Sequence, residues 1–134
     1  MDTIVNEADK IRVLVVEDEF FIAEWVAESL SDLGFAVEIV GNARDALRRL
    51  ASASVDVLFA DINLPGGMDG AALARQARQL LPGLPVIYAS ARAAMLEPQG
   101  RVRGAVFVRK PYEPEMVGRL ISEVTQPIAA AVPA

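Results

Sequence analysis

Five short apolar runs along the chain alternate with longer segments in which apolar residues recur at a helical period. The runs are rich in Val, Ile and Phe, which is typical of strands that are buried on both faces of a parallel sheet. They cover residues 11–16, 35–40, 55–60, 85–89 and 105–108. This alternation predicts a parallel sheet with helices packed on both of its faces.

The segments between the runs predict amphipathic helices, each with one apolar face. In the first helix the inward positions are Ile22, Val26, Leu30 and Leu33, and Gly34 follows where a helix would end. In the second helix the inward positions are Ala43, Ala46, Leu47 and Leu50. In the third they are Leu73, Ala77, Leu80 and Leu81. In the last helix they are Val117, Leu120, Ile121 and Val124.

Residues at the ends of these segments support the same helices. Asn42 and Asp69 are expected to cap the second and third helices, and Pro114 suits the first turn of the last one. Residues 91–99 predict a weaker helix, because Pro98 and Gly100 interrupt the segment.

The pattern as a whole predicts one α/β domain built on a doubly wound, five-stranded parallel sheet. We expect the domain to cover residues 11–125, between a flexible leader over 1–10 and a flexible tail of mostly small residues over 126–134. The sequence contains no repeat and no second block of periodic residues. A stand-alone domain without a DNA-binding or catalytic output domain is therefore expected.

Composition narrows the chemistry and the partners. The 134 residues include no Cys and no His, which excludes disulfides, Ser-His-Asp triads, thiolate nucleophiles and phosphohistidine on this chain. The net charge of −5 argues against nucleic acid as a direct partner. No apolar run reaches the roughly 18 residues that span a bilayer, and the polar N-terminus does not resemble a signal peptide. We expect a cytoplasmic protein without membrane contact.

Polar residues follow four of the five apolar runs. Glu17 and Asp18 follow the first run, Asp61 the third, Ser90 the fourth and Lys110 the fifth. Ligands of doubly wound sheets bind beyond the carboxyl ends of the strands, so we expect these five side chains to gather at one edge.

Such a group needs cations. Three neighbouring carboxylates repel one another, and a hard divalent ion such as Mg²⁺, which prefers oxygen ligands, would relieve that repulsion. Lys110 adds a second positive charge. A phosphoryl group entering this site would find a metal, an amine and the Ser90 hydroxyl for its oxygens, and a carboxylate nucleophile to accept it.

The same residues resemble the receiver domain of two-component response regulators, of the CheY type, over roughly residues 11–125. The matching stretches are Val15-Val16-Glu17-Asp18, Ala60-Asp61-Ile62-Asn63-Leu64-Pro65, Met68-Asp69-Gly70, Ala89-Ser90-Ala91 and Arg109-Lys110-Pro111. Each stretch alone is weak evidence, but all five in this order are specific. The resemblance implies a flavodoxin-like strand order 2-1-3-4-5.

The resemblance also implies roles for the residues at the predicted edge. Asp61 would be the phospho-acceptor, with Lys110 paired to the phosphoryl group and Ser90 turning toward it. Asp18, Asp61 and the backbone carbonyl of Asn63 would bind Mg²⁺ (or Mn²⁺) directly, and Glu17 would act through a metal-bound water. Phe107, three residues before the lysine, would be the aromatic switch. The peptide bond between Lys110 and Pro111 is often cis in this family.

As a receiver, the chain would take its phosphoryl group from a histidine kinase or a phosphotransfer protein. It would signal to a downstream protein through the surface of its fourth helix, fifth strand and last helix, or serve as a phosphorelay intermediate or phosphate sink. Its own catalysis would be limited to phosphoryl transfer to Asp61 and autodephosphorylation.

Two departures from the common receiver pattern stand out. Gly66-Gly67 makes the loop after Asp61 one residue longer, which would change the access of water to a phosphoryl group there. The segment predicted as the fourth helix is short and broken, so the output surface is expected to be atypical.

Taken one at a time, these residues also fit purely structural roles. An acidic pair after a strand can be a solvated turn, Asp61 and Ser90 can cap turns or helices, and Phe107 can be a core residue. The chain as a whole could also be a receiver-like interaction module that is never phosphorylated, or an aspartyl-phosphate phosphatase. A phosphatase would need a general acid two residues after Asp61, where this chain has Asn63.

Overall fold

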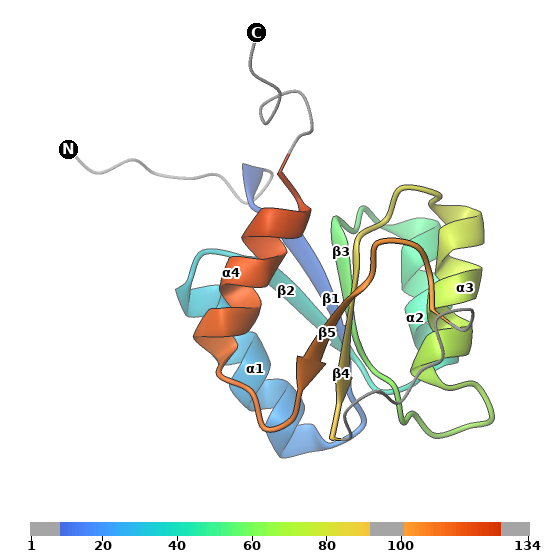
Figure 1. Cartoon of the computed structure of the whole chain (residues 1–134), viewed down its shortest axis with the longest axis horizontal. Coiled ribbons are helices and arrows are strands. Elements are labelled where there is room, and N and C mark those ends of the chain that lie inside the picture. The colour runs from blue at the N-terminus through green and yellow to red at the C-terminus, as the bar shows by residue number, and fades with distance from the viewer. Residues whose placement is uncertain (1–8, 92–100, 127–134) are drawn as a thin grey trace, which may run out of the picture.

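The computed structural model describes residues 9–91 and 101–126, which form a five-stranded parallel sheet with helices on both faces (Figure 1). The strand order is β2-β1-β3-β4-β5, as the resemblance implied. The strands are β1 (Arg12–Val16), β2 (Ala36–Val40), β3 (Val57–Asp61), β4 (Val86–Ser90) and β5 (Val106–Arg109). All neighbouring strands are parallel, so their carboxyl ends meet at one edge of the sheet.

The helices cover the sheet in two layers (Figure 1). The helices α1 (Phe20–Asp32) and α4 (Pro114–Val124) pack together on one face, while α2 (Ala43–Ser52) and α3 (Gly70–Leu80) pack together on the other. Each layer closes its own hydrophobic cluster against the sheet. The central strands β3 and β4 are buried along their whole length, which explains why their sequences are continuous apolar runs.

The helix ends are as expected from the sequence. The side chains of Asn42 and Asp69 accept hydrogen bonds from the backbone N–H groups of Asp45 and Ala72, both at 2.8 Å. Gly34 follows α1 in the left-handed region, with φ at 102°, where a residue with a side chain would be strained. Pro114 occupies the first turn of α4.

Two predicted inward positions are wrong. Leu33 and Leu80 are each 49% exposed. Leu33 is the residue after α1, and Leu80 is the last residue of α3. At both positions the apolar face of the helix extends beyond the sheet that it covers. Helical periodicity gives the direction of a side chain but not the point at which the sheet beneath the helix ends.

Some predictions fall outside the described part of the chain. Residues 92–100 contain nearly all of the predicted fourth helix, and the predicted leader and tail lie mostly within 1–8 and 127–134. Each helix in the part of the chain that the structure describes is too short or too polar to span a bilayer.

Replacing the cap residue Asn42 with Ala is expected to lower the free energy of unfolding by about 1 kcal/mol. The variant would leave the N–H of Asp45 without its partner at the start of α2. Glu113→Ala is a matched control, because Glu113 begins α4 without a side-chain cap bond. Urea denaturation measures both, and equal stability of the two variants would contradict the role given to Asn42.

Candidate functional site

The polar residues at the strand ends gather at one edge of the sheet, as the sequence predicts. Glu17 follows β1 directly, Asp61 and Ser90 are the last residues of β3 and β4, and Lys110 follows β5. Asp61 and Ser90 were expected just beyond their strands. They lie inside them because the ladder continues past both residues, with Ile62 N–H donating to the Ala89 carbonyl and Lys110 N–H to the Ser90 carbonyl.

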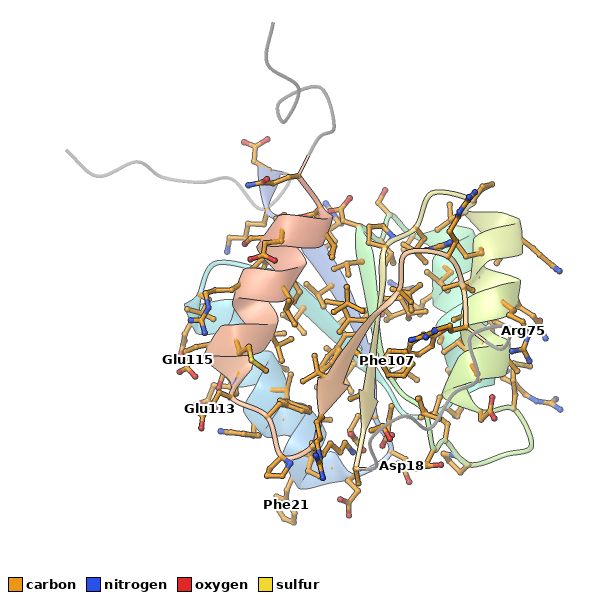
Figure 2. The ribbon with its side chains drawn as sticks, in the orientation of Figure 1. Asp18, Phe21, Arg75, Phe107, Glu113 and Glu115 are labelled. Atoms are coloured by element: carbon orange, nitrogen blue, oxygen red, sulfur yellow. The ribbon has the colours of Figure 1, made fainter. Side chains whose placement is uncertain are left out.

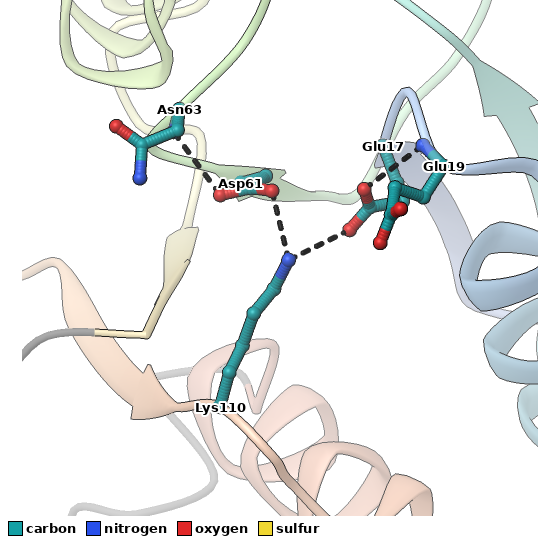
Figure 3. A network of polar contacts seen from close by, with 5 residues as sticks. All are labelled: Glu17, Glu19, Asp61, Asn63 and Lys110. Atoms are coloured by element: carbon teal, nitrogen blue, oxygen red, sulfur yellow. Dashed lines mark hydrogen bonds and ion pairs between the residues drawn. The ribbon is translucent and has the colours of Figure 1, made fainter.

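Lys110 joins two buried carboxylates (Figure 3). Its Nζ donates to Asp61 Oδ2 at 2.8 Å and to Glu17 Oε1 at 3.1 Å. Glu17 is 6% exposed and Asp61 8% exposed. Carboxylates with so little exposed surface need a charged partner, and Lys110, which follows β5, supplies one to Glu17 after β1 and to Asp61 on β3.

The backbone holds the second oxygen of each carboxylate (Figure 3). Asn63 N–H donates to Asp61 Oδ1, and Glu19 N–H donates to Glu17 Oε2, both at 3.1 Å. Each bond runs from the residue two positions later in the chain, as in an Asx-turn. The Asp61 carboxylate is therefore oriented by a backbone group on one side and by Lys110 on the other.

Burial affects the pKa values of Glu17 and Lys110, the two charged residues beside Asp61. Desolvation raises the pKa of Glu17, although the Glu19 N–H and Lys110 oppose the shift. Burial by itself lowers the pKa of Lys110, but its hydrogen bonds and charge interactions with Asp61, and then with Glu17, outweigh this and raise it. Lys110 therefore keeps its positive charge at neutral pH.

The donor set fits a hard divalent cation. Carboxylate oxygens of Glu17, Asp18 and Asp61 lie within 4.8 Å of one another. All donors are oxygen, which suits Mg²⁺ or Mn²⁺, and Asp18 is exposed, which would allow a bound Mg²⁺ to keep some of its waters. The carbonyl of Asn63, next but one to Asp61, remains a predicted ligand.

Ser90 and Phe107, the two predicted switch residues, lie on the neighbouring strands β4 and β5. Ser90 is 2% exposed at the end of β4. Phe107 is half-buried on β5 (Figure 2), with its ring centroid 5.0 Å from that of Tyr88. The guanidinium of Arg101 lies 5.3 Å from the same ring, which is cation–π distance.

Tyr112 is a residue of this region that the sequence analysis missed. It follows the Lys110–Pro111 peptide bond, which is cis, as the resemblance implied. Its buried ring stacks on Trp25 of α1 at 6.2 Å and meets Phe59 of β3 edge-on at 5.5 Å. Burial raises its pKa. The sequence feature that could have indicated Tyr112 is an aromatic residue directly after a Lys-Pro pair at a strand end.

The loop after Asp61 contains two consecutive left-handed residues. Gly66 and Gly67 have φ angles of 90° and 86°. Residues with side chains rarely adopt this conformation, so both glycines are needed for the path of this loop toward α3.

The fold and the site define the class: a doubly wound domain with a lysine-paired carboxylate centre at the carboxyl edge of its sheet. The chain also matches the model of the response regulator receiver domain over residues 13–122. It therefore belongs to this family, the receiver domains of two-component systems.

Curated relatives share this domain as part of longer chains. The transcriptional regulatory protein QseB of Escherichia coli O157:H7 is 35% identical over 94 residues, which are 70% of this chain and 41% of QseB. The DNA-binding transcriptional regulator NtrC of E. coli K12 is 43% identical over 82 residues, 60% of this chain and 17% of NtrC. The chain thus spans less than half the length of these two relatives.

This chain aligns with nearly the full length of two solved receiver structures. A response regulator receiver protein from Sinorhizobium medicae WSM419 aligns with a TM-score of 0.82 at 26% identity, over 88% of this chain and 96% of that one. The chemotaxis response regulator CheY4 of Vibrio cholerae aligns with a TM-score of 0.77 at 27% identity, over 86% and 98%.

Proposed function

We propose that the chain acts in the cytoplasm as a response regulator receiver, over residues 11–125, and that Asp61 accepts a phosphoryl group in a Mg²⁺-dependent reaction. The donor is a histidine kinase or a phosphotransfer protein. The observation that carries this proposal is the pairing of Lys110 with Asp61 inside the carboxylate cluster. A purely structural ion pair would not require a third carboxylate, Asp18, at the same point.

The proposed transfer is a displacement at phosphorus. An oxygen of the Asp61 carboxylate forms a bond to phosphorus while the bond from phosphorus to the donor's imidazole nitrogen breaks, and that nitrogen keeps the electron pair. Lys110 and the Ser90 hydroxyl stabilise the phosphoryl oxygens, and Asn63 N–H orients the nucleophile. A bound Mg²⁺ supplies further charge neutralisation. Later attack by water on the aspartyl phosphate releases inorganic phosphate and restores Asp61.

Phosphorylation of Asp61 signals by changing the surface of the domain. Replacing a carboxylate by an aspartyl phosphate adds charge and acceptor oxygens, which draw Lys110 and Ser90 toward the new group. Phe107, which packs against Tyr88 and Arg101 in the unphosphorylated structure, then repacks, and this alters the surface of β5 and α4. A downstream protein then binds or leaves that surface. In the alternative roles, the phosphoryl group passes to the next protein of a phosphorelay, or the chain serves as a phosphate sink.

Exposed aromatic residues beside the site favour protein partners over nucleic acid. Phe20 and Phe21 open α1 immediately after the acidic cluster and are 67% and 83% exposed, and Trp25 is 50% exposed. Phe21 projects from the same edge as Asp18 (Figure 2). Large apolar side chains held in water on a rigid helix are typical of protein-binding surfaces.

The proposal is tested by incubating the protein with acetyl phosphate, with Mg²⁺ or with EDTA, and measuring its intact mass. We expect a gain of one phosphoryl group only with Mg²⁺. No gain with any small-molecule donor, with Mg²⁺ or Mn²⁺, would favour the interaction module. Turnover of unrelated phosphate esters would favour a phosphatase, although Asn63 offers no general acid for one.

Ser90→Ala is expected to slow phosphorylation by acetyl phosphate roughly 10-fold, because a hydrogen bond to a charged group contributes about 1.5–3 kcal/mol. Ser52→Ala, on the exposed end of α2, is the matched control and should leave the rate unchanged. Single-turnover mass spectrometry measures both rates. Equal rates for the two variants would remove Ser90 from the proposed site.

A further inference from the structure

Gly70, the first residue of α3, packs directly against the backbone of Asp61. Its N–H donates to the Ile62 carbonyl at 2.8 Å, which ties the start of the helix to the end of β3. Gly70 is buried and is not in the left-handed region. Its backbone angles are therefore open to any residue, and they do not explain why a glycine stands at this position.

The space around Gly70 does explain it. A Cβ atom at this position would overlap the carbonyl oxygen of Asp61 and would come within 2.9 Å of Ile62 Cα and 3.0 Å of the Asp61 carbonyl carbon. All three atoms belong to the backbone, so no side chain can rotate away to make room. Any larger residue must push the end of β3 and the start of α3 apart.

The peptide that Gly70 contacts carries the reactive group. Asp61 itself and the Ile62–Asn63 turn, whose Asn63 N–H holds Asp61 Oδ1 at 3.1 Å, are attached to it. On the far side, Lys110 holds Asp61 Oδ2 at 2.8 Å. A shift of the Asp61 backbone would move the carboxylate relative to Lys110, Glu17 and Asp18 together.

We propose that Gly70 is a positioning residue for phosphoryl transfer: the absence of a side chain lets α3 fix the Asp61 backbone where its carboxylate meets the metal ligands and Lys110. This inference rests on the proposed function of the same site. Outer groups that orient metal ligands typically change metal affinity 10- to 100-fold when altered, and misplacement by about 1 Å can slow a reaction roughly 100-fold.

Gly70→Ala tests the inference against Gly118→Ala. Gly118 lies in α4, where an added Cβ would come within 2.8 Å of Leu33 Cδ1, so this control adds a methyl group at another crowded helix position away from Asp61. Both variants are first checked for folding by circular dichroism, with trimethylamine N-oxide added if either is unfolded, since this osmolyte favours the folded state. Titration calorimetry gives the Mg²⁺ Kd, and acetyl phosphate at saturating Mg²⁺ gives the transfer rate.

We expect Gly70→Ala to raise the Mg²⁺ Kd roughly 10- to 100-fold and to slow transfer roughly 100-fold, whereas folded Gly118→Ala keeps both values. Equal Mg²⁺ affinities and equal rates for the two folded variants would overturn the inference. If the wild type itself takes up no phosphoryl group, the proposed function fails, and the Mg²⁺ titration alone still decides whether Gly70 positions the carboxylate.

Discussion

Asp61→Asn is expected to take up no phosphoryl group from acetyl phosphate under conditions in which the wild type is fully modified. The amide oxygen lacks the charge of the carboxylate nucleophile and cannot form the aspartyl phosphate. The substitution keeps the size of the side chain and an oxygen that can accept from Asn63 N–H, so the loss would be chemical. We also expect the Mg²⁺ Kd to rise at least roughly 10-fold, because a neutral amide replaces a charged ligand. Intact-mass spectrometry and titration calorimetry measure the two effects.

Asp56→Asn is the matched control for this variant. Asp56 immediately precedes β3, at the opposite end of the strand from Asp61, and its Oδ2 accepts from Arg12 N–H at 2.8 Å. The same chemical change at that end should leave phosphorylation intact. Phosphoryl uptake by Asp61→Asn at the wild-type rate would contradict the assignment of Asp61 as the phospho-acceptor. Glu17 and Asp18 would then be the candidate acceptors.

Much of this site could be predicted from the sequence because it is built on strand ends. Parallel strands place their carboxyl ends at one edge, so the alternation of strands and helices was sufficient to place Glu17, Asp61 and Lys110 along the same edge. The distances among them depend on the strand order, which puts β1 beside β3 and only β4 between β3 and β5, on strands about 4.8 Å apart, and on the length of a lysine side chain. The strand order came from the family resemblance, since the alternation of strands and helices permits several orders.

Contacts that depend on the path of a loop or the end of a helix could not be predicted in this way. The approach of Gly70 to Asp61 is set by the loop over residues 62–69, whose course no periodicity describes. The stacking of Tyr112 on Trp25 requires knowing that α1 lies beside the turn after Lys110. The exposure of Leu33 and Leu80 reflects where each helix leaves the sheet. These features arise from tertiary packing and leave only weak local signals.

Lys110→Met is expected to change two properties of the site in opposite directions. Without its Nζ, 2.8 Å from Asp61 and 3.1 Å from Glu17, the buried carboxylates lose their cation. Transfer from acetyl phosphate at saturating Mg²⁺ should slow roughly 10²- to 10³-fold, as when one electrostatic donor to a transition state is removed. Mg²⁺ should bind about tenfold more tightly, because a positive charge that repels the ion has gone.

The same variant should depend on Mg²⁺ for its stability. In EDTA the free energy of unfolding should fall by about 3 kcal/mol, since removing one member of a buried ion pair leaves uncompensated charge. Mg²⁺ at about 100 times its Kd would return about 2.7 kcal/mol. Lys10→Met, at the only other lysine of the chain, is the control and should change neither transfer nor Mg²⁺ affinity. Tighter Mg²⁺ binding together with slower transfer cannot come from partial unfolding, which would weaken both, so this combination isolates the charge of Lys110 as the cause. Unchanged transfer in folded Lys110→Met would mean that Lys110 serves only to neutralise the carboxylates.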